Sequence, residues 1–114
     1  MGERAQIEVI DEDGKVVLYS HWLGRDVVKV VKNALSRRQR WDDSAYLTRI
    51  IFSEMILFTA RYDPAKVYEI LKDETGYGIS AGDCGGDDVV TVDIGNKKVT
   101  TRYEELSFEE FVRS

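Results

Sequence analysis

The sequence has very little cysteine, proline or histidine, with one residue of each kind among 114. A single cysteine, Cys84, excludes an internal disulfide and indicates a reducing compartment. Transition-metal sites are built from clusters of His and Cys, so one of each argues against that class of site. The sequence also contains neither a phosphate-binding glycine loop nor a GxSxG nucleophile motif. We therefore expect no metal and no cofactor.

Long hydrophobic runs and an excess of positive charge are also missing. No stretch reaches the roughly 18 consecutive apolar residues of a membrane-spanning helix. The net charge of −5 disfavours nucleic-acid binding, which needs a basic surface. The first residues lack the basic and apolar regions of a signal peptide, so the expected location is cytoplasmic. Length and composition indicate one globular domain over residues 1–114.

Residues 40–62 predict a long central helix. Its apolar positions cover most of a helical wheel, which is typical of a helix buried on several sides. Asp42 and Asp43 are placed to cap its start. Asp42, Tyr46 and Arg49 share one face, and a guanidinium in such a helix needs water, a carboxylate or an anion. Arg49 therefore either pairs with Asp42 or Asp43, or lines a pocket that holds an anionic ligand.

Residues 5–22 predict a β-hairpin. Polar and apolar residues alternate along both halves, and Asp13-Gly14 is a strong two-residue turn signal. With that turn, Val9 lies opposite Leu18. Their face of the hairpin is expected to be buried, while the other face is wet or covered only in part.

Residues 88–103 predict a second hairpin. Gly95-Asn96 supplies the turn and places Asp93 opposite Lys98, a favourable pair of charges.

The remaining predicted elements follow from caps and periodicity. They are an amphipathic helix over 25–38, a short helix from Pro64 to about 76, a strand over 77–81, a flexible loop over 82–88, and a terminal helix opened by a Ser107–Glu110 capping box. The predicted fold class is α+β: two antiparallel hairpins and a short strand form a sheet, and the buried central helix packs on one face with two or three further helices.

Four sequence blocks resemble a group of small uncharacterised proteins of phages and prokaryotes. The blocks are LYSHWLG at 18–24, RWDD at 40–43, YLTRIIF at 46–52 and ETGYGIS at 74–80, and the resemblance covers about residues 16–100. It implies no activity, cofactor or catalytic residue. It does direct attention to the four blocks as one surface.

The blocks and the central helix hold the side chains that form a candidate ligand site. These are His21, Trp22, Trp41, Asp42, Asp43, Tyr46, Arg49, Glu54 and Tyr77. In an enzyme, His21 would be the general acid or base, oriented by Asp42 or Asp43. Arg49 would hold an anionic group. The alternative is structural, with an acid capping the helix, Trp41 packing beside it and His21 ending a strand.

Three weaker hypotheses concern other residues. Cys84 could be a nucleophile with His21 as base, although nearby acids would raise its pKa. A hard cation could bind the loop acids, although their spacing is not that of an EF-hand. These acids are Asp83, Asp87 and Asp88. A basic cluster after the first helix could bind nucleic acid, or it could be a solvated helix end. This cluster is Arg37, Arg38 and Arg40.

These observations predict a small non-catalytic binding or interaction module. A homodimer is expected, because the apolar surface of the central helix exceeds what a domain of this size can cover. The alternatives are a protein or enzyme that binds a small anionic or nucleotide-like ligand in a cleft of His21, Asp42 and Arg49, and a nucleic-acid-binding protein.

Overall fold

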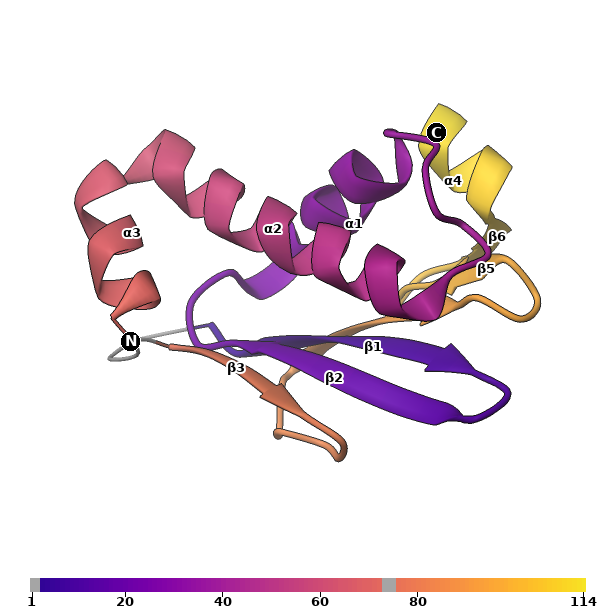
Figure 1. Cartoon of the computed structure of the whole chain (residues 1–114), viewed down its shortest axis with the longest axis horizontal. Coiled ribbons are helices and arrows are strands. Elements are labelled where there is room, and N and C mark those ends of the chain that lie inside the picture. Colours follow the sequence, from indigo (N-terminus) through magenta and orange to yellow (C-terminus); the bar gives the residue numbers. More distant parts are fainter. Residues whose placement is uncertain (1–2, 73–75) are drawn as a thin grey trace.

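A computed structural model describes residues 3–72 and 76–114 as an α+β fold with one six-stranded sheet (Figure 1). The strands are β1 (Ala5–Asp11), β2 (Gly14–Ser20), β3 (Tyr77–Ser80), β4 (Asp88–Asp93), β5 (Lys98–Thr100) and β6 (Glu105–Ser107). The helices are α1 (Val27–Leu35), preceded by a 3-10 turn (Gly24–Asp26), α2 (Ser44–Tyr62), α3 (Pro64–Leu71) and α4 (Phe108–Arg113). The helices lie on one side of the sheet, which confirms the α+β class and the packing of the helices on one face.

The first hairpin has the predicted faces in a different register. Val9 lies opposite Val16, two residues before the predicted partner. The reason is the side chain of Asp11, which accepts hydrogen bonds from the amides of Asp13 and Gly14 at 2.8 and 3.1 Å. This contact centres the turn one residue earlier than predicted. Because the pairing moves by an even number of residues, the same side chains still face the helices.

The two hairpins join through a parallel pairing, which corrects the expected antiparallel sheet. The strand order is β3-β2-β1-β4-β5-β6, and Ile7 of β1 lies opposite Val90 of the parallel strand β4. Strand β3 takes the free edge of β2, and β4 joins the free edge of β1. Within the second hairpin the predicted register is confirmed, since Asp93 lies opposite Lys98.

The second hairpin is shorter than predicted and is followed by a strand that the sequence did not indicate. The chain turns after Thr100, where the amide of Thr101 donates to the carbonyl of Glu104 at 2.8 Å, and β6 then pairs with β5. The capping box after β6 is confirmed. Ser107 Oγ accepts from the Glu110 amide at 3.1 Å, and the Glu110 carboxylate accepts from the Ser107 amide at 3.0 Å.

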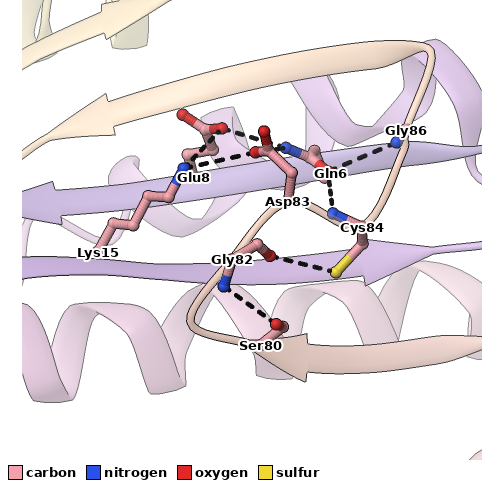
Figure 2. A network of polar contacts seen from close by, with 8 residues as sticks. All are labelled: Gln6, Glu8, Lys15, Ser80, Gly82, Asp83, Cys84 and Gly86. Carbon is pink, nitrogen blue, oxygen red and sulfur yellow. Dashed lines mark hydrogen bonds and ion pairs between the residues drawn. The ribbon is translucent and has the colours of Figure 1, made fainter.

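The chain crosses from β3 to β4 over the sheet face opposite the helices (Figures 1 and 2). We call residues 81–87 the strap. Ser80 pairs with Val17 and Asp88 with Ala5, so the path spans about 14 Å across the strands and about 10 Å along them. The eight peptide units involved reach at most about 28 Å. The sequence predicts a flexible loop here, whereas the strap packs on the sheet and leaves Val17 fully buried beneath it.

Helix α2 has one buried side, rather than burial all round. The buried residues are Leu47, Ile51, Glu54, Met55, Phe58 and Thr59. On the outer side, Leu57 is 41% exposed, and Ile50 and Ile56 are only half-buried. The helical layer is one helix deep, so α2 lies beside α1 and α3 instead of beneath them (Figure 1). Among the helices of the described ranges, none combines the length and apolarity needed to cross a bilayer.

Candidate functional site

A polar network ties the strap to β1 (Figure 2). Gln6 is 3% exposed, and its Oε1 accepts from the amides of Cys84 and Gly86 at 3.0 and 3.4 Å. Its Nε2 donates to Glu8 and Asp83, both at 3.1 Å. Both ends of the side-chain amide are therefore occupied, as burial of such a group requires. The network holds the strap to the sheet.

Lys15 of β2 completes this network from the neighbouring strand. Its Nζ lies 3.4 Å from Asp83 Oδ1 and 3.6 Å from Glu8 Oε2. The hydrogen bond from Gln6, followed by the charge of Lys15, lowers the pKa of Asp83. The charge of Glu8, followed by the hydrogen bond and charge of Asp83, raises the pKa of Lys15. Lys15 thus balances one of the two carboxylate charges of the network.

The loop acids do not converge as a cation site would require. Asp83 is committed to Gln6 and Lys15, and Asp88 lies 3.6 Å from Arg102. Within residues 3–72 and 76–114, no group of three or more His, Cys, Asp or Glu is arranged to hold a metal ion. Cys84 Sγ lies 3.6 Å from the carbonyl oxygen of Gly82, and among the described residues it makes no hydrogen bond with His21.

His21 and Asp42 lie at opposite ends of the first hairpin, so the predicted cleft is not formed. His21 Nδ1 is 3.2 Å from the Tyr19 hydroxyl, and its amide donates to the Gly76 carbonyl at 2.7 Å. Asp42 forms an ion pair with Lys97 and borders an open cavity of about 470 Å³ beside the hairpin turn. The length of β2, about 20 Å, separates the two places. The expectation failed because α2 begins at the turn end of the hairpin.

Arg49 does not pair with Asp42 or Asp43. It lies on the exposed side of α2, where its guanidinium donates to Ser53 Oγ one turn later. It does not line the cavity that Asp42 borders, and its role in holding an anionic ligand stays a prediction. Asp43 caps α2 instead, accepting from the Tyr46 amide at 3.2 Å, which confirms the structural alternative for this acid.

Trp41 and Tyr77 are packing residues in the structure. The Trp41 ring meets Phe108 edge-on at 5.4 Å between ring centroids, and its Nε1 donates to the Leu35 carbonyl at 3.1 Å. The Tyr77 hydroxyl donates to the Met55 carbonyl at 3.1 Å, and burial raises the pKa of Tyr77. These contacts hold the segment before α2 against α4 and the C-terminal half of α2 against β3.

The basic cluster after α1 is largely neutralised by carboxylates. Arg37 donates to Glu54 Oε2 from Nε at 3.0 Å and from Nη2 at 2.5 Å. Arg38 contacts both carboxylate oxygens of Glu109, each at 2.7 Å. The guanidinium of Arg40 lies 4.7 Å above a tyrosine ring of α2. Two of the three charges that nucleic-acid binding would use are thus paired within the chain, and Glu54 is bound in an ion pair.

No family model, curated protein or solved structure matches the chain. The resemblance of the four sequence blocks to small phage and prokaryotic proteins stays a prediction. The structure brings part of those blocks together, since the Trp22 ring packs against Gly76. The block at 40–43 lies at the far end of α2. Residues 74 and 75 lie outside the described residues.

Two features replace the predicted cleft as candidate sites. The first is a row of residues along the exposed side of α2, which we call the α2 seam: Tyr46, Ile50, Ser53, Leu57 and Ala60. The α2 seam could have been found from the sequence. Its residues are spaced alternately by four and three positions, which is the spacing of residues in a helix–helix contact. The second is a pocket of aromatic and acidic side chains at the C-terminal end of α2, whose members are far apart in the sequence.

Proposed function

We propose that the chain is a non-catalytic interaction module that works as a homodimer joined along the α2 seam. The observation that carries the proposal is the exposure of this seam, in which Tyr46 is 58% and Leu57 41% exposed. Five of the eight large apolar side chains exposed in the described residues lie on α2 and α3. Exposed apolar surface gathered on one layer is typical of a protein–protein interface.

The α2 seam is self-complementary in an antiparallel helix pair. If Ser53 of both copies lies on the two-fold axis, Tyr46 faces the partner's Ala60, and Ile50 lies within one residue of the position that faces the partner's Leu57. The largest side chain of the seam then meets the smallest one at each end of the contact. The small Ser53 at the centre allows close approach of the two helices, and the small Ala60 at each end leaves room for the partner's Tyr46. These matches favour a second copy of the chain as the occupant.

Arg49 lies beside the seam and sets a condition for this arrangement. Its backbone and that of its copy are eight residues apart along the paired helices, or about 12 Å at 1.5 Å per residue. In the single chain, however, the Arg49 guanidinium reaches Ser53, the residue on the proposed axis. The pairing therefore requires the Arg49 side chain to turn outward into solvent, so that the two guanidinium groups flank the seam.

The separation of the candidate acid–base residues supports a role without catalysis. His21 contacts a tyrosine hydroxyl at one end of the hairpin, and Asp42 pairs with Lys97 at the other. Glu54 is held by Arg37 between α1 and α2. General acid–base catalysis needs its groups within hydrogen-bond reach of a common substrate.

The dimer is tested by sedimentation equilibrium on the whole chain. We expect a dimer for the native sequence and a monomer for Leu57→Glu, because the substitution places two carboxylates in the apolar seam. Tyr103→Glu is the matched control, since Tyr103 is 77% exposed but lies between β5 and β6. Circular dichroism confirms that both variants fold. A monomeric native chain, or a dimer unaffected by Leu57→Glu, would contradict the proposal.

Cysteine cross-linking tests the position of the two-fold axis. In a Cys84→Ser background, Ser53→Cys is expected to form an intermolecular disulfide under mild oxidation, because both copies lie at the axis. Leu57→Cys is the control: its copies lie about 12 Å apart along the helices and cannot be bridged. Equal cross-linking of the two variants would exclude the antiparallel pairing.

A further inference from the structure

A pocket of about 260 Å³ lies where the C-terminal end of α2 meets the segment between β2 and α1. Its lining combines three aromatic residues, two acids and two smaller side chains: Trp22, Phe58, Tyr62, Asp26, Asp63, Leu23 and Thr59. We call it the aromatic–acid pocket. Its volume falls just below the range of about 300–1,000 Å³ usual for drug-sized ligands. It suits one small head group rather than a nucleotide.

The aromatic walls of the pocket are held in place from behind. The rings of Phe58 and Tyr62 lie 5.1 Å apart between centroids, and the Trp22 ring lies 5.6 Å from that of Tyr77. A Cβ at position 76 would lie 2.9 Å from the Trp22 ring, so Gly76 is needed for the ring to sit where it does. Tyr62 is 74% exposed and forms the outer wall. The Trp22 ring is thus held from behind, while Tyr62 closes the pocket on its solvent side.

The two acids give the pocket a negative charge that the chain only partly balances. The only ion pair of Asp26 among the described side chains is with Lys29 at 3.9 Å, on the surface of the same helix segment. An exposed pair at this distance contributes little. Asp63 makes no ion pair with any side chain that the structure describes. The pocket therefore favours a cation.

From this combination we infer that the aromatic–acid pocket binds an alkylammonium head group. Aromatic faces attract cations through the ring quadrupole, and they suit ammonium groups with an apolar surface, such as methylated ones. The carboxylates of Asp26 and Asp63 supply the opposite charge. Such a head group can come from a free small molecule or from a modified lysine of another protein. The inference is independent of the proposed dimer, because the pocket shares no residue with the α2 seam.

The test follows the indole N–H resonances of the chain during titration. Choline is the probe, and 3,3-dimethylbutan-1-ol is its uncharged counterpart of the same shape. We expect choline to shift the Trp22 signal and the alcohol to bind about five- to tenfold more weakly. Trp41 is an internal control, since its indole N–H is bound to the Leu35 carbonyl near the other end of α2. Equal binding of choline and the alcohol would overturn the inference.

Three variants locate the site. Tyr62→Ala removes the outer wall and Asp63→Asn removes one charge, and each is expected to weaken choline binding about three- to tenfold. Tyr68→Ala is the matched control, because Tyr68 is 68% exposed on α3 outside the pocket and its loss should change nothing. Unchanged affinity in both pocket variants would contradict the assignment.

The source of the head group is decided by a second titration. A short peptide with trimethyllysine is compared with choline and with the same peptide carrying unmodified lysine. Tighter binding of the trimethyllysine peptide than of choline would assign the pocket to a protein side chain. Binding of choline equal to or tighter than that of the peptide would assign it to a free small ammonium compound. If no probe shifts the Trp22 signal, the inference is wrong.

Discussion

At the scale of single residues, the glycine at position 86 is required by the main chain beneath it. A Cβ there would lie 2.7 Å from the carbonyl carbon of Ala5 and 2.9 Å from the amide nitrogen of Gln6. Both atoms belong to β1, which is paired on both edges and cannot move aside. Gly82, at the other end of the strap, has no such neighbour within 4 Å.

We therefore expect Gly86→Ala to lower the free energy of unfolding by about 2–3 kcal/mol, through strain between the strap and β1. Gly82→Ala, the control in the same strap, should change it by less than about 0.5 kcal/mol. Urea denaturation measures both values. Equal urea midpoints for the two variants would mean that the strap and β1 are not in close steric contact at position 86.

Local signals in the sequence predicted the structure well at this scale. The Asp43 cap and the Ser107–Glu110 capping box were predictable because all the atoms involved lie within four residues. The contact of the strap with the sheet could not be predicted in this way, because Gln6 precedes its partner Asp83 by 77 residues. Glycine-rich composition alone indicates flexibility, whereas here the glycines permit close contact with the sheet.

At the scale of elements, the segment after α1 is joined to α2 by an ion pair of uneven burial. The side chain of Glu54 is 7% exposed and that of Arg37 is 36% exposed. Glu54 Oε1 has no hydrogen-bond partner among the described residues, so the carboxylate depends on Arg37 for its compensation. Replacing a buried ion pair by apolar side chains is often neutral, while removing one partner is costly.

Arg37→Met is expected to lower the free energy of unfolding by about 2–3 kcal/mol, because it leaves the Glu54 charge buried alone. Adding Glu54→Leu should restore most of the loss. Arg38→Met is the control and should cost less than about 1 kcal/mol, since its pair with Glu109 is exposed on both sides. Chemical denaturation of the native chain, the two single variants and the double variant measures these free energies of unfolding. An equal loss of stability in Arg38→Met and Arg37→Met would contradict this account.

The elements themselves were predictable, but their pairing was only partly so. Alternation and turn signals indicated both hairpins, and Asp93 opposite Lys98 follows from one short turn. The parallel contact between β1 and β4 has no local signal, because it depends on where β3 adds to the sheet. The apolar sequence of α2 indicates burial, but it does not show whether another part of the same chain or a second chain would bury its outer side.

At the scale of the whole molecule, several surface carboxyls are stabilised in their charged form. Their pKa values are lowered, chiefly by hydrogen bonds: Asp11 from the Ser44 side chain, Asp83 from Gln6, Glu109 from Arg38 and Glu110 from the Ser107 amide. The unfolded chain binds protons more readily at these groups. Their contribution to stability is therefore present above the ordinary carboxyl pKa of about 4 and is lost as the pH falls through the lowered values.

We expect the melting temperature to decrease between about pH 5 and pH 2. Glu109→Gln should make the decrease smaller, because the variant has one fewer carboxyl to protonate. Calorimetry across this range measures both curves. A melting temperature that stays constant down to pH 3 would contradict the assignment of these carboxyls.

The prediction of a cleft formed by His21, Asp42 and Arg49 was wrong at this same scale, although these residues lie within 29 positions of one another. The sequence indicated a hairpin and a central helix but not which end of one meets which end of the other. Helix α1 carries the chain back toward the hairpin turn, so α2 starts there and ends near Trp22. His21 is consequently close to the end of α2, not to its start.

The parallel contact of β1 with β4 also governs how the chain can fold as it leaves the ribosome. The first hairpin is complete at Ser20, but the strand that covers the open edge of β1 ends only at Asp93. At about 5–20 residues per second, translation of the intervening segment takes about 4–15 s. Throughout that interval the nascent chain presents an unpaired strand edge, to which chaperones or neighbouring nascent chains have access.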